Sequence, residues 1–334
     1  MSCTKKSEIH FEKFSSYNFF NVFLVIILNL SCFFKSISSN REYKPKTKLM
    51  RTKTFMMIAA LFLLILTSCK KNSSLIDQSS LELADDDAIT DVVYDDIFNT
   101  ADYASILIEM VKGDTKSELV VTDSCPEITV ERPSGEIWPK VVTIDYGSGC
   151  TGFHDNTRSG KIIIQVTGPR HQEGSKRIVT FDNYFFNEMK VEGTKTLESK
   201  GFNTNQNFVV SAELVNGKIT LPDGKTIERT VSHEREWIAG FSTMNVWDDE
   251  CLVTGTASGK NIRDVEYTNT IISALHWKRV CRFIVAGTIK IEREGLLPIE
   301  LNYGTGDCDA KAVITRGDES KEILLGFRHK TQQD

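Results

Sequence analysis

The chain has 334 residues, of which 40% are hydrophobic and 25% are charged, and its formal net charge at pH 7 is −5. These values exclude a collagen-like or intrinsically disordered chain. Residues 1–68 contain ten Lys or Arg and three Asp or Glu, which leaves 30 basic and 42 acidic residues and a charge of about −12 in the remainder. Nucleic acid and anionic lipid headgroups require a basic surface, so we expect neither as a partner of this remainder.

A secretory signal peptide is predicted over residues 50–68. A short basic segment begins this region, twelve apolar residues run from Phe55 to Leu66, and small residues precede Cys69. The apolar run is too short to span a bilayer comfortably, which is typical of a signal peptide. Leu66–Cys69 resembles the lipobox of bacterial lipoproteins, which implies that acyl chains such as palmitate on Cys69 anchor the mature protein to a membrane. The alternative is an ordinary N-terminal membrane helix followed by a chance cysteine.

Residues 1–49 do not fit in front of a signal peptide. They contain a second apolar run at 19–34 and many Phe, Ile, Asn, Lys and Ser residues, which AT-rich codons specify. We interpret 1–49 as an extension that comes from a start codon assigned too early, with Met50 as the true initiator. The alternative is a genuine transmembrane segment at 19–34, although that run is short and contains Asn21 and Asn29.

A tether over 69–84 and an amphipathic helix over 85–113 are predicted next. The tether is polar and rich in serine, and apolar residues recur in the helix at spacings of three and four. Nine acidic residues and no basic residue lie between Glu82 and Glu109. Their spacing does not match a calcium-binding loop, so we interpret them as a solvated acidic face of the helix.

The region 119–328 is predicted to be an all-β domain. Polar and apolar residues alternate, with turn residues every eight to twelve positions, as in an antiparallel meander. Asn216-Gly217 and Asp223-Gly224 are typical of tight hairpin turns. The sequence leaves open whether the sheet forms a sandwich, a barrel or a curved open sheet, and whether it arose by internal duplication.

Two sequence similarities recur within this domain. The weaker is Val-x-Gly-Thr, which begins at Val191, Val253 and Val285. The stronger joins Val142–Cys150 to Ile299–Cys308, because both contain Tyr-Gly-[Ser/Thr]-Gly before a cysteine, and another cysteine lies 25 or 27 residues earlier. Each unit reads as a hairpin with a cysteine at both open ends, a geometry that suits a disulfide. We therefore predict the pairs Cys125–Cys150 and Cys281–Cys308 and a buried free thiol at Cys251; the rival pairing is Cys251–Cys281.

The lipobox, Asp145–Cys150, the Val191–Thr194 strand and Asn302–Asp309 together resemble a group of uncharacterised β-rich lipoproteins from Bacteroidota. The resemblance covers roughly residues 50–328 and implies a location and a fold, but no activity. Surface-exported lipoproteins of that phylum often carry acidic residues just after the lipidated cysteine. Lys70-Lys71-Asn72 follows Cys69 instead, which implies an outer-membrane protein that faces the periplasm.

Motifs for catalysis or for metal binding are scarce. The sequence contains no His-Glu-x-x-His, Gly-x-Ser-x-Gly, P-loop or dinucleotide motif, and we interpret His233 as a surface or turn residue.

Arg316-Gly317-Asp318 is typical of a hairpin turn and is not expected to act as an adhesion motif. A sugar-binding surface could use Trp237 and Trp247 with Asp248 and Asp249, although burial is the commoner environment of tryptophan.

We therefore expect a lipid-anchored, non-catalytic binding or structural module of the cell envelope, with no catalytic residue, metal or cofactor. Its expected partners are the membrane, through the acyl chains on Cys69, and an unidentified protein or glycan. One alternative is a carbohydrate-active enzyme that uses two carboxylates distant in sequence. Another is a carrier of an apolar ligand, which would need an apolar concavity.

Overall fold

A computed structural model describes residues 75–110 and 125–326, apart from positions 134 and 244. The predicted extension, the signal peptide and Cys69 lie outside these residues. The described chain begins with helix α3 (Gln78–Met110) and includes two short 3₁₀ segments, η1 (Phe153–Asp155) and η2 (Val246–Asp248). The strands are β1 (Glu127–Glu131), β2 (Lys140–Asp145), β3 (Cys150–Thr151), β4 (Thr157–Val166), β5 (Lys176–Phe186), β6 (Met189–Phe202), β7 (Phe208–Thr220), β8 (Thr226–Ala239), β9 (Glu250–Lys260), β10 (Glu266–Lys278), β11 (Ala286–Glu292), β12 (Ile299–Thr305), β13 (Lys311–Arg316) and β14 (Glu319–Leu324).

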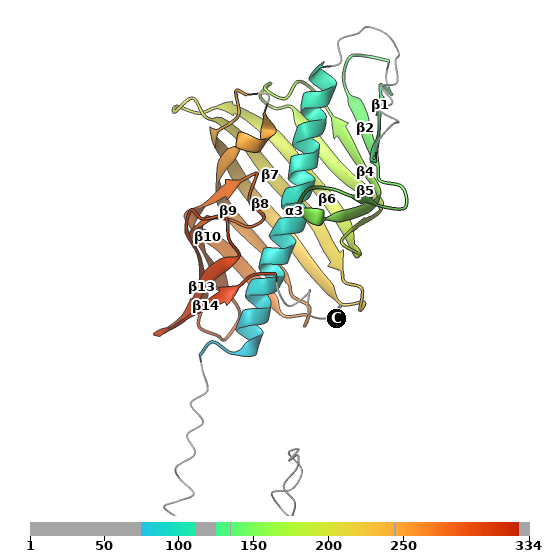
Figure 1. The fold of residues 1–334 in the computed structure, drawn as a ribbon. Coiled ribbons are helices and arrows are strands. Elements are labelled where there is room, and N and C mark those ends of the chain that lie inside the picture. Colours follow the sequence, from blue (N-terminus) through green and yellow to red (C-terminus); the bar gives the residue numbers. More distant parts are fainter. Residues whose placement is uncertain (1–74, 111–124, 134, 244, 327–334) are drawn as a thin grey trace, which may run out of the picture. The chain divides into compact units, whose positions relative to one another are not determined.

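These strands form one open antiparallel sheet. Apart from β3, which pairs only with β4, each strand pairs with the next along the chain, and β1 and β14 form the two edges. The predicted meander is therefore confirmed, and of the three predicted arrangements the open sheet is the one observed. Helix α3 lies along one face of this sheet (Figure 1).

Helix α3 packs on the sheet through small and β-branched residues, as its spacing predicted. Val93, Ile97, Ala101 and Ala104 are completely buried. The helix begins at Gln78, seven residues earlier than predicted, because Asp77 caps it: the Asp77 carboxylate accepts a hydrogen bond from the Ser80 amide at 3.0 Å. The end of the predicted tether is therefore helical.

The Val-x-Gly-Thr repeats mark β-bulges. Gly193, Gly255 and Gly287 all have positive φ, and each lies at a shift of register between strands. A Cβ atom at Gly255 would collide with the Ser232 carbonyl oxygen of the neighbouring strand β8. Only glycine fits these positions, and such bulges bend a strand and increase its twist.

One of the two predicted hairpin turns is wrong. Asp223-Gly224 does turn the chain between β7 and β8, and the Gly224 amide bonds the Leu221 carbonyl at 2.9 Å. Asn216-Gly217 instead lies inside β7, where Asn216 has a φ of 53° and the register shifts on both sides of the strand. The same positive φ that permits a turn here forms a bulge opposite Gly193.

Both predicted disulfides are present, and each closes a hairpin at its open end. Cys125 and Cys150 flank the β1–β2 hairpin with Cα atoms 5.8 Å apart, and Cys281 and Cys308 flank β11–β12 with Cα atoms 5.2 Å apart. Cys251 is a buried free thiol in β9, so the rival pairing of Cys251 with Cys281 is wrong.

Candidate functional site

The acidic residues of α3 face the sheet, so the predicted solvated acidic face is wrong. Asp86, Asp87 and Asp102 are completely buried. No local pattern indicates this burial, because the arginines that compensate these carboxylates lie on strands and loops distant in the sequence. The ion pairs join Asp87 and Asp91 to Arg229, Asp95 to Arg235, Asp96 to Arg158, Asp102 to Arg170 and Arg177, and Glu82 to Arg263.

Two arginines pair with the completely buried Asp102. Arg170 donates hydrogen bonds from both Nε and Nη2 to its carboxylate, at 2.8 and 2.9 Å, and Arg177 donates a third at 3.2 Å. Burial by itself raises the pKa of Asp102, but the charges of Arg170 and Arg177 outweigh burial and hold that pKa below its ordinary value. The guanidinium of Arg170 also lies 4.5 Å from the ring centre of Phe241. This cluster therefore fixes the C-terminal half of α3 to the sheet.

A second charged cluster lies between α3 and the middle of the sheet. Burial, followed by the charge of Arg235, lowers the pKa of Lys195 to about 7, and its Nζ donates to the Tyr94 carbonyl at 2.8 Å. His233 projects from β8 into the same cluster, so its predicted surface or turn position is wrong, and burial beside Arg229 lowers its pKa well below 6.5. The cavity here measures about 30 Å³. It has room for a water molecule but not for a substrate.

A much larger cavity lies beside α3. It measures about 550 Å³ and is lined by the helix, by residues of β1, β2 and β4, and by the chain at 246–247 and 277–282. This volume is typical of sites that enclose small molecules. Its apolar lining includes Val92, Leu107, Ile128, Ile144, Trp247 and Trp277.

Three arginines contribute charge to this cavity. Arg158 is paired with Asp96, and its Nε donates to the carboxylate at 2.9 Å. Arg279 lies 3.6 Å from Asp249. Arg282 forms no ion pair within the described residues, and its buried Nε has no hydrogen-bond partner there. The cavity is therefore mainly apolar, with one uncompensated cation in its wall.

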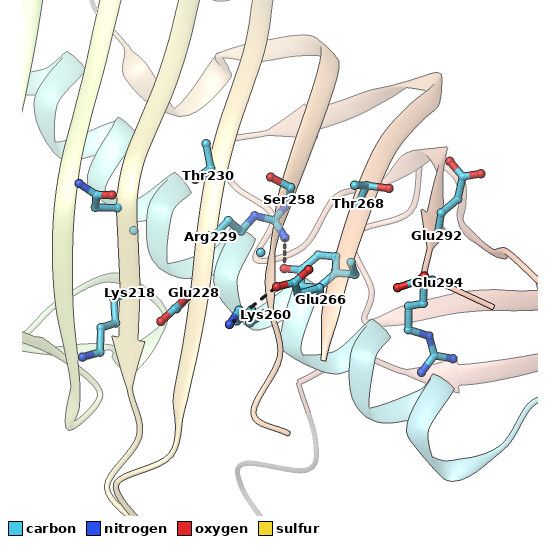
Figure 2. A pocket seen from close by; sticks show the side chains of 15 residues that line it. Lys218, Glu228, Arg229, Thr230, Ser258, Lys260, Glu266, Thr268, Glu292 and Glu294 are labelled. Atoms are coloured by element: carbon cyan, nitrogen blue, oxygen red, sulfur yellow. Dashed lines mark hydrogen bonds and ion pairs between the residues drawn. The ribbon is translucent and has the colours of Figure 1, made fainter. Parts of the chain in front are cut away.

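A second hollow, of about 820 Å³, opens on the outer face of strands β7 to β11 (Figure 2). Its side chains are polar or charged, and they project side by side from neighbouring strands (Figure 2). Lys260 bridges Asp264 at 3.2 Å and Glu266 at 3.8 Å. The opposing charges of this groove are thus partly paired with one another, and it lacks the apolar lining of the cavity beside α3.

The four predicted binding residues do not form one surface. Trp237 is buried among aromatic rings, 5.7 Å from the ring centre of Phe208, and is not accessible to a sugar. Trp247 is 45% exposed and lines the cavity beside α3. Asp248 accepts a hydrogen bond from the Thr243 hydroxyl at 2.9 Å, and Asp249 is buried against Arg279. Only Trp247 reaches the candidate site directly.

Arg316-Gly317-Asp318 has a structural role. Gly317 and Asp318 connect β13 to β14, as the sequence predicted for a hairpin. Arg316 is buried and donates to the carbonyl oxygens of Leu75, at 2.9 Å, and Leu297, at 3.2 Å. Its guanidinium therefore holds the segment before α3 and is not displayed for a receptor.

Comparison with protein-family models, with curated proteins and with solved structures found no match for this chain. In the described part of the chain, no group of three or more His, Cys, Asp or Glu side chains is arranged to hold a metal ion. No helix among the same residues is both long enough and apolar enough to cross a membrane. The cavity beside α3 is the feature on which a functional proposal can rest.

Proposed function

We propose that this protein is a lipid-anchored binding protein of the cell envelope, which holds a small and largely apolar ligand in the cavity beside α3. The cavity carries this proposal, because it combines a volume of about 550 Å³ with an apolar lining and a few polar groups. Trp247 and Trp277 lie in its wall, so an apolar ligand has two indole rings to pack against.

Membrane anchoring is supported by the lipobox-like Leu66–Cys69. In this proposal the signal peptide 50–68 is removed, acyl chains on Cys69 bind the outer membrane, and the described chain faces the periplasm. Two or more acyl chains are needed because one chain holds a protein only marginally. Metabolic labelling with radioactive palmitate tests this step: the wild-type protein should be labelled and should sediment with membranes, whereas Cys69→Ala should be unlabelled and soluble.

Ligand binding can be tested with N-phenyl-1-naphthylamine, an uncharged probe whose emission rises in apolar surroundings. We expect saturable binding with energy transfer from Trp247 and Trp277. Thr100→Phe should lower the affinity, because Thr100 lines the cavity from α3 and a larger side chain occupies its space. The matched control is Thr230→Phe, on the outer face of β8. Equal binding by both variants would place the probe elsewhere and would contradict the proposal.

A further inference from the structure

Most of the buried arginines between α3 and the sheet have a counter-charge or hydrogen-bond partners on the helix. Arg158, Arg170, Arg229 and Arg235 each form an ion pair with an aspartate of the helix. A guanidinium removed from water is costly unless a counter-charge and hydrogen bonds replace its hydration. The carboxylates of α3 supply the counter-charge for these four residues.

Arg282 has neither an ion pair nor a hydrogen bond among the described residues. It follows Cys281 in the segment that leads to β11, it is half-buried, and its Nε is enclosed without a hydrogen-bond partner among the described residues. Burial lowers its pKa, and no charged neighbour contributes to that shift. Its guanidinium lies over the ring of Phe283, 5.7 Å from the ring centre. A ring face only weakly offsets the loss of hydration.

The neighbouring groups do not offer Arg282 a counter-charge. Asp91 and Asp95 line a separate recess of about 10 Å³ together with Arg282, but their carboxylates are paired with Arg229 and Arg235. His154 also lines the cavity; burial, together with the charge of Arg282, lowers its pKa, so the imidazole is neutral at pH 7. The positive charge of Arg282 is therefore left for whatever occupies the cavity.

We infer that the ligand of this cavity is an anionic amphiphile, an apolar chain that ends in one carboxylate or phosphate group, and that Arg282 binds this group. The inference rests on the proposed function, since it assigns a chemical class to the ligand of the same cavity. The apolar wall formed by Ile128, Ile144 and Trp277 receives the chain. The two Nη groups of Arg282, which are not enclosed as its Nε is, offer donors that suit either oxyanion.

The test compares three ligands with the same twelve-carbon chain: dodecanoate, dodecyl phosphate and uncharged dodecanol. Each is titrated below its critical micelle concentration into the purified protein, by displacement of N-phenyl-1-naphthylamine. A hydrogen bond to a charged group corresponds to about tenfold or more in affinity, so at least one anion should bind about tenfold more tightly than dodecanol. The comparison of dodecanoate with dodecyl phosphate shows which head group the site prefers.

Variants separate the anion site from the rest of the cavity. Arg282→Gln should remove the preference for the anion and leave the affinity for dodecanol unchanged, whereas Arg282→Lys should keep part of the preference. Lys225→Gln, which removes one positive charge at an exposed position, is the matched control. If none of the three ligands binds, the proposed function fails. If dodecanol binds as tightly as both anions, or if Arg282→Gln weakens all three ligands equally, the assignment of Arg282 is overturned while the apolar cavity stands.

Discussion

Asp102 on α3 and Arg170 in the loop between β4 and β5 are joined by two parallel hydrogen bonds in a site closed to solvent, although 68 residues separate them in sequence. The pair belongs to a series of aspartate–arginine contacts along the helix. A helix with so many buried carboxylates can lie on this sheet only because the sheet presents arginines opposite them. The contact surface thus specifies one register of α3, since a shift would leave several charges unpaired.

Asp102→Asn is expected to destabilise the fold strongly, because it leaves Arg170 and Arg177 buried without a counter-charge. The expected loss is about 3–5 kcal/mol in the free energy of unfolding. Urea denaturation followed by circular dichroism measures it. Glu192→Gln is the matched control: it breaks the exposed pair with Lys190, which should cost no more than about 1 kcal/mol. Equal losses in the two variants would contradict a role of the buried pair in holding α3.

Lys195→Met is expected to stabilise the protein most at neutral and lower pH. The folded-state pKa of Lys195 is about 7, below its ordinary value of 10.5, so between these values the unfolded chain holds the proton and the folded chain does not. Stability of the wild type therefore gains from this group as the pH rises from about 7 to about 10.5, and the full cost of burying the charge applies below 7.

Melting temperatures measured from pH 6 to pH 10 test this expectation. The difference between Lys195→Met and the wild type should be largest at pH 6 and should shrink towards pH 10. Lys225→Met, at an exposed position of the turn after β7, controls for the loss of one lysine. A variant that melts below the wild type at pH 6 would show that the contact with the Tyr94 carbonyl outweighs the cost of burial.

Gly255→Ala should destabilise the sheet more than Gly224→Ala. Both glycines have positive φ, which costs an alanine about 1–2 kcal/mol, but a Cβ at Gly224 meets open space. At Gly255 the Cβ also meets the backbone of Ser232 and His233, and overpacking adds about 1–3 kcal/mol. We expect losses of about 2–5 and 1–2 kcal/mol in urea denaturation. Similar losses at the two positions would argue against a structural requirement for the bulge in β9.

Cys251 is expected to be unreactive in the folded protein, because burial raises the pKa of its thiol well above the ordinary value and shields it from reagent. Iodoacetamide should modify the peptide that contains Cys251 only after unfolding in urea without reductant. Mass spectrometry of the same non-reducing digest should find Cys125 linked to Cys150 and Cys281 linked to Cys308. Rapid modification of Cys251 in the native protein would show that β9 opens readily.

Local chemistry made much of the sheet predictable. Successive side chains of a strand point to opposite faces of the sheet, and this does not depend on distant parts of the chain. The strands of the meander could therefore be predicted from the alternation of polar and apolar residues. The cysteines at the open ends of two similar hairpins likewise identified Cys125–Cys150 and Cys281–Cys308. Asn216-Gly217 marks the limit of such local reasoning, because a positive φ serves a turn and a bulge equally well.

The sequence by itself determined the antiparallel order, the disulfides and the apolar face of α3, because each depends on residues that are neighbours in sequence or on adjacent strands. Only the tertiary structure decided that the carboxylates of α3 are buried, since their pKa and their solvation depend on arginines 62 to 181 residues away. The tertiary structure also decided which residues line the cavity. The sequence identified Trp247 as a candidate binding residue, but it did not identify Arg282. A cation without a counter-charge is recognisable only once every neighbouring carboxylate has been placed.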